Sequence, residues 1–182
     1  TDMGRAILWN EVLPFIEGEY PNVHATMLPR PCMHCDNPPC TKVCPVKATY
    51  KNDEGIVVVD YARCIGCRRC TVACPYAVRY FNWYEPEWPE ELKAHLIPDA
   101  EVQPRPKDVV EKCTFCIQRV RKAREKAEAE GRTFNATDYI PACVQTCTGH
   151  ARYVGDLDDP DSLVSKLAHS PRAYRLLEEL GT

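Results

Sequence analysis

The chain has 182 residues, a formal charge of −3 at pH 7 and 12 cysteines. That length suits one domain with appendages, and the charge gives no sign of the basic excess that nucleic-acid binding requires. Mean hydropathy is −0.40, and no stretch approaches about 18 consecutive apolar residues, so the sequence predicts no membrane-spanning helix. The cysteines are the feature that needs an explanation.

Residues 1–31 form a segment that leads into the first cysteine motif, and VHATMLPRP (23–31) is expected to be extended. The motif itself is C-x2-C-x4-C-x3-C-P, with Cys32, Cys35, Cys40, Cys44 and Pro45. Four thiols this close can form disulfides, hold a zinc ion or hold an iron–sulfur cluster. The stretch that follows, 50–60, combines a polar turn at Gly55 with a β-branched run, which predicts a hairpin arm.

The second motif decides among these chemistries. It reads C-x2-C-x2-C-x3-C-P, with Cys64, Cys67, Cys70, Cys74 and Pro75, which is the run that bacterial ferredoxins use for [4Fe–4S] clusters. Iron favours soft thiolate ligands, and the fourth cysteine of such a run ligates the other cluster of a two-cluster protein. Zinc sites more often show two separated C-x2-C pairs without a third close cysteine.

Crossing the fourth ligands predicts two ligand sets. Cys32, Cys35, Cys40 and Cys74 would hold one [4Fe–4S] cluster. Cys64, Cys67, Cys70 and Cys44 would hold the second.

A proline-rich insertion is expected at 84–112, followed by a second cluster-binding half at 113–156. This half contains Cys113 and Cys116, a helix expected over 115–132, and then Cys143 and Cys147. The spacing of these four cysteines is also compatible with a zinc site. However, CPVKATY (44–50), CPYAVRY (74–80) and CTGHARY (147–153) all place a tyrosine six residues after the cysteine, so the third group is interpreted as another ferredoxin half-motif.

Residues 78–83 and 151–156 are further strand candidates. Residues 157–182 suggest two short helices, the first capped by Asp159 and separated from the second by Pro171. Short strands alternate with cluster loops, and the second half repeats the pattern of the first. This arrangement predicts an α+β fold. We expect a duplicated ferredoxin-like domain, the bacterial dicluster 4Fe-4S type, at 32–83 and onward, with loop-rich insertions and a short helical C-terminus.

No phosphate loop, nucleophile elbow or paired-carboxylate pattern is found, so no catalytic residue is predicted. A cluster with four protein thiolates has no open coordination position, and its remaining chemistry is one-electron exchange. Nearby cations favour the reduced, more negative form and should raise its potential; the basic residues near these loops are Lys42, Lys47, Arg63, Arg68, Arg69, Arg79 and Lys112. His34 lies within a cluster loop, where a supporting role is expected rather than iron ligation.

PRPCMHCDNPPCTKVCP, CIGCRRCTVACPYAVRYFN, KCTFC, PACVQTC and GDLDDP, in this order, resemble the iron–sulfur electron-transfer subunits of complex molybdoenzymes. That family includes the small subunits of dimethyl sulfoxide, polysulfide, tetrathionate and arsenate reductases and the iron–sulfur protein of formate-dependent nitrite reduction. The resemblance covers about residues 20–168. It implies a non-catalytic relay between a membrane quinone-reactive subunit and a catalytic subunit that carries molybdenum or tungsten bis-pterin. It also implies a place at the membrane periphery, with the outer face favoured over the cytoplasmic face.

The chain departs from this family in one respect. Family members usually begin with another cysteine run and hold four clusters, whereas here no cysteine precedes Cys32, and residues 1–13 resemble the stretch that follows that run. We therefore expect a segment to be missing before residue 1. By the family's pairing, Cys113, Cys116 and Cys143 would share one cluster with the last cysteine of that missing run, and Cys147 would complete the cluster of its first three cysteines. If the chain is complete, the four late cysteines would instead close a third cluster by themselves. The alternative to a relay is an interaction scaffold stabilised by clusters or zinc, without a redox role.

Overall fold

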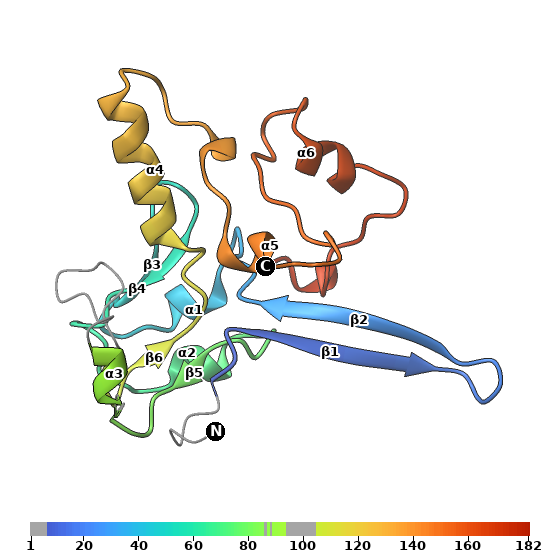
Figure 1. Ribbon diagram of the computed structural model, residues 1–182. Coiled ribbons are helices and arrows are strands. Elements are labelled where there is room, and N and C mark those ends of the chain that lie inside the picture. The colour runs from blue at the N-terminus through green and yellow to red at the C-terminus, as the bar shows by residue number, and fades with distance from the viewer. Residues whose placement is uncertain (1–6, 86, 88, 94–104) are drawn as a thin grey trace. The chain divides into compact units, whose positions relative to one another are not determined.

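The computed structural model describes residues 7–85, 87, 89–93 and 105–182, without the side chains of residues 92 and 93. The chain divides into two compact units, one comprising residues up to Thr114 together with Thr182, the other Phe115–Gly181. Each unit is described by itself (Figure 1). Part of the predicted insertion at 84–112, namely residues 86, 88 and 94–104 with Pro86, Pro98 and Pro104, lies outside the described residues, as do residues 1–6.

The first unit opens with a long antiparallel hairpin of β1 (Asn10–Glu17) and β2 (His24–Pro31). It extends as an arm away from the cysteine loops of its own unit (Figure 1). Arg30 and Glu11 face each other in the register and form an ion pair. The expected extended segment at 23–31 is thus confirmed as β2, whereas its partner β1 was not expected. Since β2 ends at Pro31, it delivers Cys32 directly into the first motif.

The predicted hairpin at 50–60 is confirmed, with β3 (Thr49–Lys51) antiparallel to β4 (Val57–Val59). Its turn is closed by the side chain of Asn52, which accepts from the main-chain N–H of Ile56 at 2.7 Å. Gly55 has a φ of 79°, which glycine adopts without the strain that other residues meet.

The strand expected at 78–83 is present as the short β5 (Tyr80–Phe81). Its antiparallel partner is β6 (Val110–Glu111), on the far side of the insertion. The helix α3 (Glu90–Lys93) lies within that insertion.

Cysteines are part of the buried core of this unit. Two one-turn helices, α1 (Pro39–Lys42) and α2 (Arg69–Val72), pack against each other. Cys40 and Cys70 lie in these helices and pack with Val57 and Val110 in one buried cluster. The same interior that stabilises the unit therefore positions one cysteine of each motif.

The second unit is mainly helical, with α4 (Ile117–Ala129), α5 (Ala142–Gln145) and α6 (Leu163–Ala168). Short 3-10 turns cover Ala136–Asp138 and Glu178–Leu180. The helix predicted at 115–132 is confirmed as α4, and Gly131 follows its end with a φ of 67°. A left-handed glycine just after a helix is a common helix stop.

Two local predictions for this unit are wrong. Residues 151–156 form no strand; the first of them, Ala151, donates its N–H to Cys147 Sγ at 3.3 Å instead of to a neighbouring strand. Helix α6 is capped by Ser162, whose Oγ accepts from Ser165 N at 3.1 Å, and not by Asp159. Asp159 accepts from Asp161 N at 2.9 Å and so closes the turn before the helix.

The mixture of short helices and antiparallel strand pairs is consistent with the expected ferredoxin-like α+β class. No helix among the described residues has the length and apolar character to cross a membrane.

Candidate iron–sulfur sites

The first motif folds as a loop followed by one helical turn. Cys32 follows β2, Cys35 lies in the loop, and Cys40 lies buried in α1. The longer spacing between Cys35 and Cys40 holds Pro38 and Pro39, which occupy the start of α1. Proline fits the first turn of a helix because its missing N–H would be unpaired there in any case. The two extra residues of this motif therefore serve to start α1 beneath the loop.

The second motif repeats this arrangement with a glycine in its loop. Gly66 has a φ of 66°, and a Cβ there would lie 2.3 Å from the carbonyl oxygen of Asp108. Only glycine allows this close approach of two backbones. The loop that carries Cys64 and Cys67 is therefore held against the segment that enters β6.

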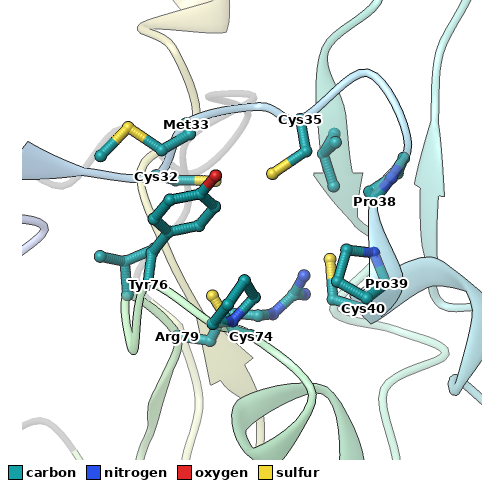
Figure 2. A pocket seen from close by; sticks show the side chains of 12 residues that line it. Cys32, Met33, Cys35, Pro38, Pro39, Cys40, Cys74, Tyr76 and Arg79 are labelled. Carbon is teal, nitrogen blue, oxygen red and sulfur yellow. The ribbon is translucent and has the colours of Figure 1, made fainter. Parts of the chain in front are cut away.

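Four cysteines line each of two cavities in the first unit. The first cavity has a volume of about 310 Å³, including space open to solvent, and its lining includes Cys32, Cys35, Cys40 and Cys74. Figure 2 shows their sulfur atoms distributed around its open centre. The second has a volume of about 300 Å³, again including space open to solvent, and its lining includes Cys44, Cys64, Cys67 and Cys70. The structure thus gathers the residues of both predicted ligand sets, including the exchanged fourth cysteines.

The sulfur arrangement also bears on the choice of metal. Within the described part of the chain, no three His, Cys, Asp or Glu side chains come close enough to hold a single metal ion. A structural zinc site needs its four ligands around one ion, with sulfur at about 2.3 Å. A cubane takes one thiolate at each iron, so it accepts sulfurs that stand further apart. Four soft thiolates around a shared cavity fit an iron–sulfur cluster.

Main-chain N–H groups point at one of the exchanged cysteines. Burial alone would raise the pKa of the Cys44 thiol, but hydrogen bonds from the main chain of Thr49, Val46, Ala48 and Lys47 lower it. These residues come just after Pro45, so the turn that follows the motif supplies donors to the Cys44 sulfur. Such donors stabilise a thiolate and a cluster sulfur alike.

Burial acts in the opposite direction on the cysteines of the core. It raises the pKa of the Cys40 and Cys70 thiols, and the positive charge of Arg79 only partly offsets this. Burial also raises the pKa of the Cys35 thiol. A buried thiolate needs a compensating positive charge, which a cluster's iron or a nearby cation supplies.

His34 is a buried support of the first loop, in agreement with its expected role. Burial, followed by the positive charge of Lys112, lowers the pKa of His34 to about 3. The imidazole is therefore neutral, and its Nδ1 accepts from the main-chain N–H of Val57 at 3.1 Å. This bond ties the loop of the first motif to β4.

The third cysteine group repeats the backbone of the first two. The residue before the second cysteine of each C-x2-C pair has a positive φ: His34 at 47°, Gly66 at 66° and Phe115 at 57°. The third residue after the last cysteine does too: Lys47 at 53°, Ala77 at 52° and His150 at 46°. In each case the latter residue donates its N–H to the carbonyl of that cysteine, at 3.3, 3.2 and 3.0 Å. Positive φ is rare outside glycine, so its recurrence at equivalent positions is informative.

Within the second unit, two of the late cysteines accept main-chain hydrogen bonds. Ala142 N donates to Cys116 Sγ at 3.4 Å, which brings Cys116 next to the turn that carries Cys143. Ala151 N donates to Cys147 Sγ at 3.3 Å. Cys113 belongs to the first unit.

Sequence reasoning did not assign two functional features of these sites. One is the close approach of Gly66 to Asp108, whose only signal is the glycine in CIGC. The other is the burial of Arg79 and Lys112, because the sequence does not distinguish them from the other basic residues near the loops. Arg79 is 5% and Lys112 is 1% exposed. Charge alone does not distinguish a buried cation from a surface one.

Comparison with known proteins agrees with this geometry. Residues 23–90, which contain both closely spaced motifs, match the family model described as a 4Fe-4S dicluster domain. The chain is 46% identical, over 98% of its length, to the menaquinone reductase iron–sulfur cluster-binding subunit of Nitratidesulfovibrio vulgaris and covers 71% of that protein. It is 44% identical over 93% of its length to a selenate reductase subunit of Mesobacillus selenatarsenatis. It is 34% identical over 97% of its length to the arsenate respiratory reductase iron–sulfur subunit of a Shewanella species.

The chain spans 58% of the selenate reductase subunit and 80% of the arsenate reductase subunit, so these relatives are longer. A putative dimethyl sulfoxide reductase iron–sulfur subunit and a tetrathionate reductase subunit also match, at 44% and 39% identity. The shared feature of these relatives is that each is a subunit of a reductase complex. The chain belongs to the family of iron–sulfur electron-transfer subunits of complex iron–sulfur molybdoenzymes and related reductases.

Proposed function

We propose that this chain is a non-catalytic relay that passes single electrons through several [4Fe–4S] clusters. The observation that carries the proposal is the exchange of fourth cysteines: Cys74 lines the cavity of the first motif and Cys44 that of the second. This is the pairing that two-cluster ferredoxins use. Two sites that share their motifs are necessarily neighbours, which suits electron transfer between them.

The first cluster would be held by Cys32, Cys35, Cys40 and Cys74, and the second by Cys64, Cys67, Cys70 and Cys44. When bound, such a cluster has all its irons ligated by protein and supplies one-electron exchange. The chain's part is to exclude bulk solvent from Cys40 and Cys70, to supply N–H donors such as those around Cys44, and to place positive charge nearby. These are the levers by which a protein sets a cluster's potential.

Cys113, Cys116, Cys143 and Cys147 would ligate further iron–sulfur sites. The recurring positive φ before Cys116 and after Cys147 supports this assignment over zinc, because it repeats the backbone of the two closely spaced motifs. They would close a third cluster themselves, or share two clusters with a further motif.

The partners are proposed from the relatives. Their names describe subunits of menaquinone, selenate and tetrathionate reductases. The chain would thus lie between a membrane quinone-reactive subunit and a catalytic subunit with a molybdenum or tungsten bis-pterin. The chain would then lie at the membrane periphery, with the outer face favoured.

Anaerobic stopped-flow absorbance on the intact complex tests the relay. Reductant supplied through the quinone site should bleach the visible cluster absorbance, and the terminal acceptor should restore it. Cys67→Ser, which removes a proposed ligand of the second cluster, should slow this transfer at least tenfold while a dye that reduces the catalytic subunit directly still supports turnover. A complex that transfers electrons at the same rate with zinc in these sites would instead establish the scaffold function.

A further inference from the structure

Burial separates the basic residues near the cysteine loops into two groups. Lys42, Lys47, Arg63, Arg68 and Arg69 are exposed. Arg79 and Lys112 are buried. Water screens an exposed charge strongly, so only a buried cation acts on a nearby cluster at close to full strength.

The guanidinium of Arg79 is held by a hydrogen bond to Thr49 and lies beside the Cys40 thiol. Arg79 immediately precedes β5, and its Nη2 donates to Oγ1 of Thr49, at the start of β3, at 2.8 Å. Its Nε and Nη1 are buried and meet no acceptor at hydrogen-bond distance among the described residues, while the guanidinium interacts with the nearby Cys40 thiol. Leaving such donors unpaired is costly, so a buried N–H group without a partner points to an acceptor that occupies the site.

These donors belong to a side chain that lines the first cavity. Arg79 lies in its wall with Cys32, Cys40 and Cys74, and Figure 2 shows the guanidinium directed toward the Cys40 sulfur. The cluster that these cysteines would hold brings sulfur atoms into this space. Sulfur bound to iron accepts N–H hydrogen bonds, which is one way that proteins tune clusters.

Arg79 also interacts with the second set of cysteines. Burial alone would lower its pKa, but the negative charges of Cys40, Cys70 and Cys32 raise it. Cys40 and Cys32 line the first cavity, whereas Cys70 lines the second. Cys40 and Cys70 pack in one buried cluster, so the guanidinium lies where the two ligand sets meet.

We propose that Arg79 is a shared positive charge that raises the reduction potentials of both clusters of the first unit and donates N–H···S hydrogen bonds to the first. This inference rests on the proposed function. Each cluster takes up one electron without a bond being made or broken, and the added negative charge is stabilised by the same cation. The effect is larger at the first cluster, whose cavity Arg79 lines.

The test is an EPR-monitored redox titration of the intact complex that carries Arg79→Gln. The midpoint of the first cluster should fall by the equivalent of at least a tenfold change in its reduction equilibrium, which is 59 mV for one electron. That of the second should fall by a smaller, measurable amount. Arg69→Gln, in an exposed position two residues after Cys67, is the matched control and should shift neither midpoint. A shift of one cluster only, or of none, would overturn the shared role.

A second measurement does not depend on how well the variant assembles. In wild-type complex labelled with ¹⁵N-arginine, pulsed EPR of the reduced first cluster should detect weak coupling to guanidinium nitrogen, and Arg79→Lys should abolish it. The absence of that coupling in wild-type complex would contradict the hydrogen bond. Iron and sulfide analysis of the same samples distinguishes a failure of the Arg79 inference from a failure of the proposed function. A wild-type chain without iron would refute the proposed function.

Discussion

The main-chain N–H of Val57 donates a hydrogen bond to Nδ1 of His34 at 3.1 Å. The two residues are far apart in sequence, and the bond joins the loop between Cys32 and Cys35 to the strand β4. The imidazole can accept because burial keeps it neutral, with a pKa of about 3. His34 also has a φ of 47°, in the left-handed region.

Replacing His34 by phenylalanine should therefore destabilise the first loop. His34→Phe keeps an aromatic ring but leaves the Val57 N–H without its acceptor, at a cost of about 1–3 kcal/mol. His34→Asn should cost clearly less, because its Oδ1 replaces Nδ1 and asparagine tolerates a positive φ. Urea unfolding of the cluster-loaded protein, monitored by visible absorbance, measures the loss of stability in both variants. Equal losses in the two variants would show that the hydrogen bond is not what matters.

Gly66→Ala should prevent the second site from assembling. The new Cβ would lie 2.3 Å from the Asp108 carbonyl and 3.0 Å from the Phe81 ring, in a backbone conformation with a φ of 66°. Because the obstructing atom is backbone, the loop itself must move. Iron analysis should show a loss of about four iron atoms per chain, the content of one cubane.

Gly55→Ala is the matched control for this change. It also has a positive φ, of 79°, but its Cβ would meet only Lys51 Cε at an ordinary 3.6 Å. Gly55→Ala should retain full iron, and its free energy of unfolding should fall by only about 1–2 kcal/mol, the cost of the left-handed conformation. Equal iron loss in both variants would show that strain, and not the contact with Asp108, governs assembly.

The exchange of fourth cysteines has a spectroscopic consequence. If Cys44 lies on the second cluster, Cys44→Ser should perturb the same EPR signal as Cys64→Ser and leave the signal affected by Cys35→Ser unchanged. Cys74→Ser should do the reverse. The opposite grouping, with Cys44→Ser acting on the signal that depends on Cys35, would establish that each motif holds its own cluster.

The late cysteines should bind iron independently of the first two sites. Cys143→Ser should remove about four iron atoms per chain if these cysteines close a cluster of their own, while both first-unit EPR signals stay intact. Thr146→Ser, which keeps the hydroxyl that donates to the Ala142 carbonyl at 2.8 Å, is the control and should retain full iron. Full iron in Cys143→Ser, with zinc lost instead, would contradict an iron–sulfur role for this group.

Much of the first unit's local structure could be predicted from the sequence. The hairpin of β3 and β4 was predicted because a polar turn and a β-branched run are local signals. The grouping of the two cysteine sets around separate cavities followed from motif spacing, since short loops determine which sulfurs can meet. Helix α4 has a long charged pattern and a glycine stop, both of which are also local.

The features that were missed depend on contacts outside their own stretch of sequence. Strand β1 forms by pairing with β2, and β6, which was not predicted, pairs with the expected β5 across the insertion. Residues 151–156 have strand-like residues but no partner strand, and Ala151 bonds to a sulfur instead. The burial of Arg79 near Cys40 and Cys70, which lie in different motifs, likewise depends on segments far apart in the chain, and no single stretch of sequence reveals it.

Iron and acid-labile sulfide per chain, measured on anaerobically purified complex with the mass of the mature chain, test the central claim most directly. The cysteines present predict about 12 iron atoms in three cubanes, or about 16 if a further motif belongs to the mature chain. Visible absorbance should bleach reversibly on reduction. Stoichiometric zinc with little iron would contradict the account.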